Sequence, residues 1–197
     1  DLVRSITYAT NSQNPVDLRD LKSNDSKQKS LETAMRDLGF TYRRHRSEAS
    51  LTPEDISSAT AAEAVLSVWR SRPHQAKFNG REHFGRLYDL IFSDDLNAAQ
   101  TVIATLIYRY AENKRRRPAE GASPVEGYGS SFLAMLMGRY LLADLGISLQ
   151  ALGHVLFPKA QELLAEKEAD YHRRALAEVE AAIGRLYGQK PISLQRL

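Results

Sequence analysis

From about residue 51 to residue 187, apolar residues recur every three or four positions, which is the spacing of one face of an α-helix. The densest part of this pattern lies between Ser123 and Gly146. Ser123 and Glu126 form a capping box at its beginning, and Gly146 is a typical helix stop. Its apolar side chains cover more than half of the helix circumference, which predicts a helix in the centre of a bundle. These residues are Phe132, Leu133, Leu136, Met137, Tyr140 and Leu141.

Start and stop signals divide the rest of this region into further helices. Thr52 followed by Pro53 predicts a helix start, and Pro73 ends the apolar pattern that follows. The other helical patterns cover residues 93–117, 148–157 and 158–187, with two short pieces between residues 73 and 95. In the last long pattern we expect Leu164, Leu176, Val179, Ile183 and Leu186 to face inward. The region after residue 50 therefore predicts six or seven helices.

The first 50 residues have a different pattern. Residues 2–9 and residues 40–46 each suit a short strand. Between them lie an amide-rich stretch, residues 9–25, and a helix that Ser23 or Asn24 caps and Gly39 ends. The predicted fold class is mainly α: a multi-helix bundle of six or seven helices with a small N-terminal strand–helix–strand element.

We divide the chain into residues 1–50, the C-terminal remainder of an α/β part, and residues 51–197, a helical domain. The opening reads as a strand entered partway through a fold, so we expect the chain to be a piece of a longer protein.

Composition and missing motifs exclude several classes of protein. The chain has no Cys, which excludes disulfides, zinc–thiolate sites and cysteine nucleophiles and is compatible with a cytoplasmic location. The longest apolar run, residues 132–137, is too short to span a bilayer, so we expect no membrane partner. The motifs of P-loop NTPases, α/β-hydrolases and zincins are all absent. No catalytic residue is predicted.

Two basic runs raise the question of a nucleic-acid partner. Bases at positions 43–46 and 114–117 can neutralise phosphates, but a solvated surface explains them equally well, because the second run ends a predicted helix. The candidate nucleic-acid-binding residues are Asn11, Gln13, Asn14, Arg19, Arg43, Arg44 and Arg46. The amides among them either read base edges or satisfy backbone groups of a preceding segment, and we favour the second role.

Metal chemistry has only weak candidates. Asp17, Asp20 and Asp25 hold a magnesium ion only if a turn brings them together, and capping of turns and helices explains them better. His74 and His83 are separated by nine positions across a glycine bend, which fixes no ligand geometry. We expect no cofactor, and Mg²⁺ only if the protein is a nuclease.

The amide-rich stretch also carries a family resemblance. The segment ITYATNSQNPVDLRDLKSNDSKQKSLETAMRDLGFTYRRHR resembles the characteristic stretch of the AIPR family, the abortive infection phage resistance proteins of bacteria. The places that define the match are Asn11, Gln13, Asn14, Asp20, Leu21, Asp25 and Gln28. The resemblance implies a phage-defence protein, of which this chain is the C-terminal part, and an upstream part that carries further family motifs.

Three functional hypotheses follow. The first is a nucleic-acid-directed or scaffold module of a defence system, with DNA or RNA, other phage-defence proteins and a homo-oligomer as its expected partners. The second is an Mg²⁺-dependent nuclease that uses Asp17, Asp20 or Asp25. The third is a pure protein–protein interaction module that binds its partner through the long C-terminal helix.

Overall fold

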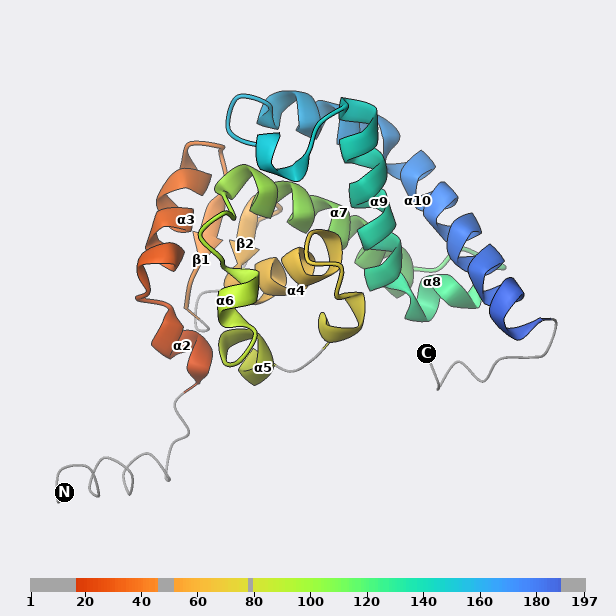
Figure 1. Cartoon of the computed structure of the whole chain (residues 1–197), viewed down its shortest axis with the longest axis horizontal. Helices are drawn as coiled ribbons and strands as arrows, with labels where there is room; N and C mark the ends of the chain where they lie inside the picture. Colours follow the sequence, from red (N-terminus) through yellow and green to blue (C-terminus); the bar gives the residue numbers. More distant parts are fainter. Residues whose placement is uncertain (1–16, 46–51, 78–79, 189–197) are drawn as a thin grey trace, which may run out of the picture.

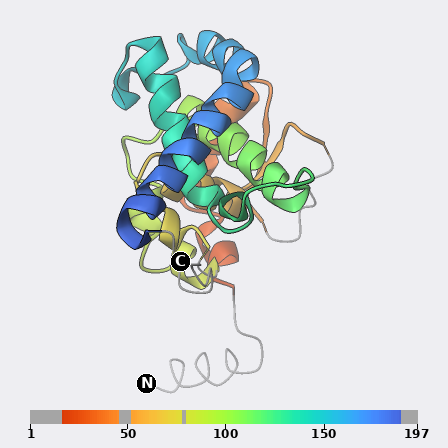
Figure 2. The same ribbon diagram turned by 90° about the vertical axis from the view of Figure 1, so that its right-hand side faces the viewer.

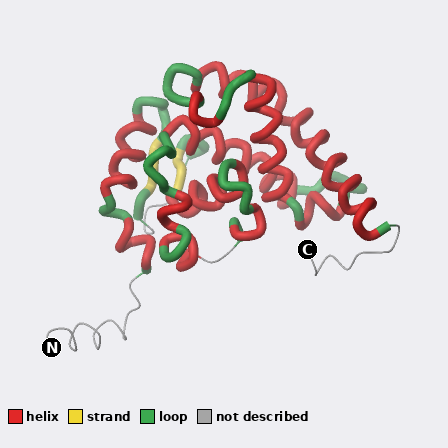
Figure 3. The backbone as a smooth tube through the Cα atoms, in the orientation of Figure 1, coloured by secondary structure: helices red, strands yellow, loops and turns green. Residues whose placement is uncertain are grey.

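The computed structural model describes residues 17–45, 52–77 and 80–188 and confirms a mainly helical fold with a small two-stranded sheet in its N-terminal region (Figure 1). Figure 3 shows the two short strands among the helices. The helices are α2 (Leu18–Lys22), α3 (Ser26–Arg36), α4 (Ser58–Val68), α5 (Gly80–Phe84), α6 (Tyr88–Ile91), α7 (Ala98–Arg116), α8 (Pro124–Tyr128), α9 (Ser130–Leu145) and α10 (Phe157–Tyr187). Two 3₁₀ turns, η1 (Pro73–Gln75) and η2 (Leu149–Ala151), and the strands β1 (Thr41–Arg43) and β2 (Asp55–Ser57) complete the described part.

Helices α4, α7, α9 and α10 form the centre of the bundle. Helix α7 lies against α4, α9, α8 and α10, while α9 contacts α4 and α10 (Figures 1 and 2). The core side chains of α7 include Ile103 and Ile107, and those of α9 include Leu133 and Met137, all fully buried. The apolar pattern predicted for residues 123–145 therefore does belong to a central helix, which it shares with α7.

The predicted single helix over residues 123–145 is two helices. Ser123 caps α8 and accepts a hydrogen bond from the Val125 N–H at 3.2 Å, but α8 ends at Gly129, from which α9 starts. A side chain at Gly129 would place its Cβ 2.8 Å from the carbonyl oxygen of Val125. Glycine thus permits the close turn that separates the two helices.

The predicted helix start at Thr52 is wrong. Residues 55–57 form β2, which pairs in parallel with β1 in the register Thr41 to Asp55, and the helix begins only at Ser58, where Ser57 is the cap. The Thr52 N–H donates to the carboxylate of Asp55 at 2.9 Å, so the local polar groups close a turn before the strand. This strand pair joins the two sides of position 50, and the division of the chain into two domains stays a prediction.

The helix predicted in the N-terminal region is α3, but the predicted cap, Ser23 or Asn24, is wrong: the cap is Asp25, which accepts from the Lys27 N–H at 2.9 Å. Gly39, with φ of +82°, ends this segment as predicted, and β1 confirms the strand expected within residues 40–46. Helix α2, which Asp17 caps, was not predicted. The strand expected over residues 2–9 lies outside the described residues.

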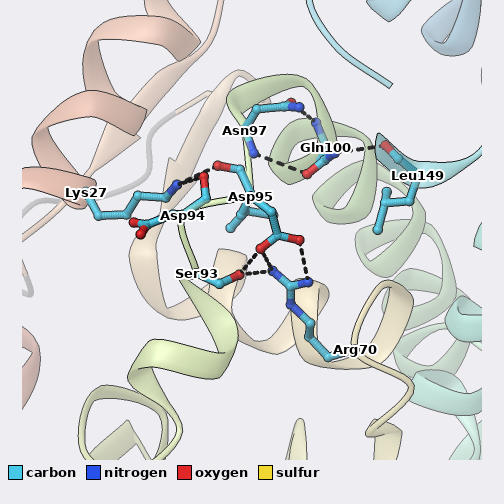
Figure 4. Close-up of polar contacts among 9 residues, drawn as sticks. Lys27, Arg70, Ser93, Asp94, Asp95, Asn97, Gln100 and Leu149 are labelled. Carbon is cyan, nitrogen blue, oxygen red and sulfur yellow. Dashed lines mark hydrogen bonds and ion pairs between the residues drawn. The ribbon is translucent and has the colours of Figure 1, made fainter. Parts of the chain in front are cut away.

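The N-terminus of α7 lies in a polar network. Asn97 and Gln100 form a reciprocal capping box, so the helix starts at Ala98 and not at Ser93 (Figure 4). Ser93 and Asp95 instead hold the guanidinium of Arg70. The ammonium of Lys27 donates to the backbone oxygens of Asp94 and Leu96 at 3.1 and 2.7 Å. These contacts tie α3 and α4 to the start of α7.

Helix α10 begins with Pro158 in its first turn, as the sequence predicts, and its last turns extend beyond the body of the bundle (Figure 1). Leu164, Leu176, Val179 and Ile183 pack against the core as expected. The prediction that Leu186 faces inward is wrong, because its side chain is 76% exposed. Leu186 lines an open hollow that α10 shares with α8 and α9, so no side chain covers it within the described residues.

Candidate functional site

A buried carboxylate joins α7 to two other parts of the chain. Glu112, only 7% exposed, accepts from the Lys77 ammonium at 2.6 Å through Oε1 and from the Arg115 guanidinium at 2.9 and 3.0 Å through Oε2. The hydroxyl of Ser130, at the start of α9, also donates to Oε1. Burial alone would raise the pKa of Glu112, but the hydrogen bonds from Arg115, Lys77 and Ser130 lower it to about 2. The carboxylate is therefore ionised and held on all sides.

One turn earlier on α7, Tyr108 extends this network to α4. Its hydroxyl donates to Oε2 of Glu63 at 2.8 Å and accepts from the Lys77 ammonium at 2.7 Å. Burial and the neighbouring Glu63 raise the pKa of Tyr108, so the phenol stays protonated. The face of α7 that carries Tyr108 and Glu112 is thus fixed by charged hydrogen bonds to α4, to Lys77 and to α9.

Fixing this face leaves three bases at the end of α7 directed at solvent. Lys114, Arg116 and Arg117, which we call the basic patch, are exposed. Within the described residues, none of their side chains forms a hydrogen bond or an ion pair; the Lys114 ammonium lies 5.5 Å from the centroid of the Tyr110 ring. The helix dipole favours positive charges at a C-terminus, so these three bases do not destabilise the end of α7.

Two hollows lie beside the basic patch, one on each side of α7. The smaller has a volume of about 160 Å³ and includes Glu63, Arg109, Asn113 and Arg116 in its wall. The larger, of about 380 Å³, lies between α7 and α10 and shares Arg109 and Asn113 with the first. The guanidinium of Arg109 donates to the backbone oxygen of Pro53 and to that of Asp55, the first residue of β2, so it forms a fixed part of both walls.

Unlike the bases of the basic patch, Arg19, Arg43 and Arg44, which the sequence predicts as nucleic-acid-binding residues, have partners inside the chain. Arg43 pairs with Asp55 at 2.9 Å, and Arg44 pairs with Glu32 at 3.0 Å and donates to the backbone oxygen of Ser23. Arg19 donates to the Ser58 hydroxyl at 2.7 Å and to the backbone oxygen of His45 at 3.2 Å. All three therefore connect the N-terminal element internally. Asn11, Gln13, Asn14 and Arg46 lie outside the described residues, and their role in binding nucleic acid stays a prediction.

The acidic candidates are distributed along the two N-terminal helices. Asp17 and Asp25 each cap a helix, and Asp20 lies in the first turn of α2. Across residues 17–45, 52–77 and 80–188, no group of three or more His, Asp or Glu side chains is arranged to hold a metal ion. His83 is buried, with its Nε2 3.0 Å from the backbone oxygen of Gln75, which is a structural contact.

The polar network around Glu112 was missed by sequence reasoning. Tyr108 and Glu112 are four positions apart and so share one face of α7, but the large apolar residues of the pattern recur on another face, so the sequence gives only this spacing as a signal. Lys77 and Ser130, which bind Glu112, come from other segments of the chain. No local spacing in the sequence predicts that they contact it.

Comparison with known proteins gives one match. Residues 1–185 match the model of a protein family described as AIPR protein. No curated protein and no solved structure matches the chain. In the part of the chain that the structure describes, no helix is both long enough and apolar enough to cross a membrane. Because the family model covers most of the sequence, the chain belongs to the AIPR family.

Proposed function

We propose that this chain is a nucleic-acid-directed module of a cytoplasmic phage-defence protein, and that the basic patch at the end of α7 contacts phosphates. Membership of the AIPR family points to abortive infection and phage resistance. The single observation that supports nucleic-acid contact is the basic patch: three exposed bases within four positions at the end of α7, without an ion pair in the described part of the chain.

The geometry favours phosphate contact at this place for two reasons. First, within the described residues the side chains of Lys114, Arg116 and Arg117 form no hydrogen-bonded ion pair, although the charge of Lys114 also acts on the nearby Glu168, so these bases can replace the counterions of a nucleic acid. Second, the network around Glu112 fixes the helix that carries them. Binding therefore costs little conformational freedom of the backbone. By contrast, the guanidinium of Arg43 already forms an ion pair with Asp55.

The chemistry of the patch predicts binding without strong sequence preference. Lysine and arginine contacts to phosphates position a protein on nucleic acid, whereas base contacts specify sequence. Asn113, exposed beside the patch and in the walls of both hollows, is the nearest amide that offers a base contact. We therefore expect a modest preference for unpaired bases, which can enter a hollow.

The test is fluorescence anisotropy of the full chain with labelled duplex DNA, single-stranded DNA and RNA at about 50 and 200 mM salt. The variant changes Lys114, Arg116 and Arg117 together to Ala. The matched control changes Lys29, Arg36 and Lys159 to Ala, which removes the same charge from exposed positions elsewhere.

We expect the patch variant to bind at least about tenfold more weakly and to lower the slope of log K against log salt by about 2 to 3, while the control changes affinity by less than about threefold. Equal losses in both triple variants would mean that net charge alone drives binding and would refute the assignment. Absence of binding to all three nucleic acids would refute the proposed function.

A further inference from the structure

An apolar groove lies at the opposite end of the α7–α8 connection. Its walls are Val125 and Tyr128 of α8, Phe132 of α9, and Val179, Ile183 and Leu186 of α10. The groove has a volume of about 240 Å³, and its rim exposes large apolar side chains, with Tyr128 68% and Leu186 76% exposed. Contiguous exposed apolar surface of this kind marks an interaction site.

Polar contacts outside the groove join the helices that form it. On one side, Oε1 of Glu126 in α8 lies 3.7 Å from Nδ1 of the buried His172 in α10. On the other, the Tyr140 hydroxyl of α9 donates to Glu178 of α10. The Tyr171 hydroxyl of α10 also donates to Asp144 of α9, and these two contacts together show that α10 runs antiparallel beside α9 (Figures 1 and 2). The groove is therefore preformed between three fixed helices.

We propose that this groove binds the α10 helix of a second copy of the chain, so that two copies associate about a two-fold axis roughly parallel to α10. The end of α10 has the form that such a groove accepts: an amphipathic helix with apolar side chains at positions 179, 183 and 186. Because this helix is both wall and insert, the surface is complementary to itself, as a two-fold interface requires.

Charge complementarity supports a second copy as the occupant. Arg139 is exposed on α9, two turns after Phe132 and on the same face, and within the described residues it has no carboxylate partner. Glu180 is exposed beside the apolar stripe of α10 and has no basic partner there either. Among the described residues, each chain thus offers Arg139 and Glu180, two charges of opposite sign without an ion-pair partner, on the helices that form the groove.

The spacing of these charges agrees with the two-fold arrangement. Seven residues separate Phe132 from Arg139, about 10 Å along α9, and six separate Glu180 from Leu186, about 9 Å along α10. In a parallel pair of α10 helices, the second helix runs antiparallel to α9. When its Leu186 lies over Phe132, its Glu180 comes level with Arg139.

The test is the oligomeric state of the full chain, measured by sedimentation equilibrium over a range of concentrations. We expect a dimer whose dissociation constant rises about tenfold in Arg139→Glu and in Glu180→Arg, since each change brings like charges together at two equivalent places. The double variant restores the opposite charges, and its dissociation constant returns to within about threefold of the original.

Two further variants separate the groove from general surface effects. Leu186→Glu is expected to abolish the dimer with an unchanged far-UV circular dichroism spectrum, because the side chain is already largely exposed. Val155→Glu is the control, since Val155 is 89% exposed and distant from the groove in sequence, and it is expected to leave the dimer intact. A monomeric wild type at about 100 μM, or a double charge variant no better than the single ones, would overturn the proposal.

Discussion

Gly138 offers the sharpest test of how the helices pack. It lies in α9 where this helix crosses α4, and a Cβ added there would come within 3.0 Å of Cγ1 of Val68 and lie 3.0 Å from Cζ3 of Trp69. Carbon atoms in contact are normally about 3.5 to 4.0 Å apart. A single methyl group at position 138 therefore forces α4 and α9 apart.

The size of the effect follows from what can move. Val68 is buried, and the indole N–H of Trp69 donates to the backbone oxygen of Gln100 at 2.8 Å, so neither neighbour yields easily. Overpacking of this kind costs up to about 3 kcal/mol, and the better helix propensity of alanine returns about 1 kcal/mol. For Gly138→Ala we expect a net loss of about 2 kcal/mol, which corresponds to a fall in Tm of about 4 to 8 °C.

Gly184→Ala is the matched control. This glycine also lies inside a helix, α10, but nothing lies within 4 Å of the place its Cβ would take, so only propensity acts and we expect a gain of about 0.5 to 1 kcal/mol. Both values come from urea denaturation followed by circular dichroism. If Gly138→Ala proves as stable as Gly184→Ala, the close approach of α4 and α9 is wrong.

Three further predictions concern polar groups. Asp55→Asn leaves Arg43 without its buried carboxylate and should cost about 1 to 3 kcal/mol in urea denaturation. The pKa of Glu112 is lowered to about 2, so the ionised carboxylate contributes fully to the free energy of unfolding above the ordinary glutamate pKa. This contribution is lost as pH falls from about 4.5 to 2. Denaturation at several pH values should show that the free energy of unfolding falls by about 3 kcal/mol over this range, a loss that Glu112→Gln lacks. Asn97→Ala removes the cap shared with Gln100 and should lower the free energy of unfolding by about 1 to 2 kcal/mol, with an equal or higher stability in the variant arguing against the cap.

The parts of the fold that the sequence predicts are those decided within a few residues. Gly39 and Gly146 both adopt a positive φ and end helical segments, because glycine takes this conformation without strain. The start at Thr52 failed for the opposite reason. Its cap and proline fit a helix locally, but residues 55–57 pair with β1, and a strand partner supplied by residues 41–43 has no local signature.

In the candidate site, too, the sequence predicts what neighbouring residues decide and misses what depends on distant partners. The basic patch is visible in the sequence as a run of bases at the end of a helix pattern, but which of those bases are free is not. Arg115 is paired with Glu112, while Arg116 and Arg117 are unpaired within the described residues. Likewise, Arg43 and Arg44 look as exposed as any arginine until their partners Asp55 and Glu32 are placed beside them.

The two proposed surfaces are close along the chain, and this has a consequence for binding. Residues 118–123 connect the basic patch at the end of α7 to α8, which forms one wall of the groove. A dimer formed through the groove carries two basic patches, so a nucleic acid long enough to reach both is held at two places, and its apparent affinity exceeds that of a short one. Leu186→Glu separates the copies without touching the patch. It should therefore reduce the affinity for long nucleic acid to that for short nucleic acid, whereas loss of the patch weakens both alike. If length has no effect in the wild type, the two surfaces act independently or one of them is absent.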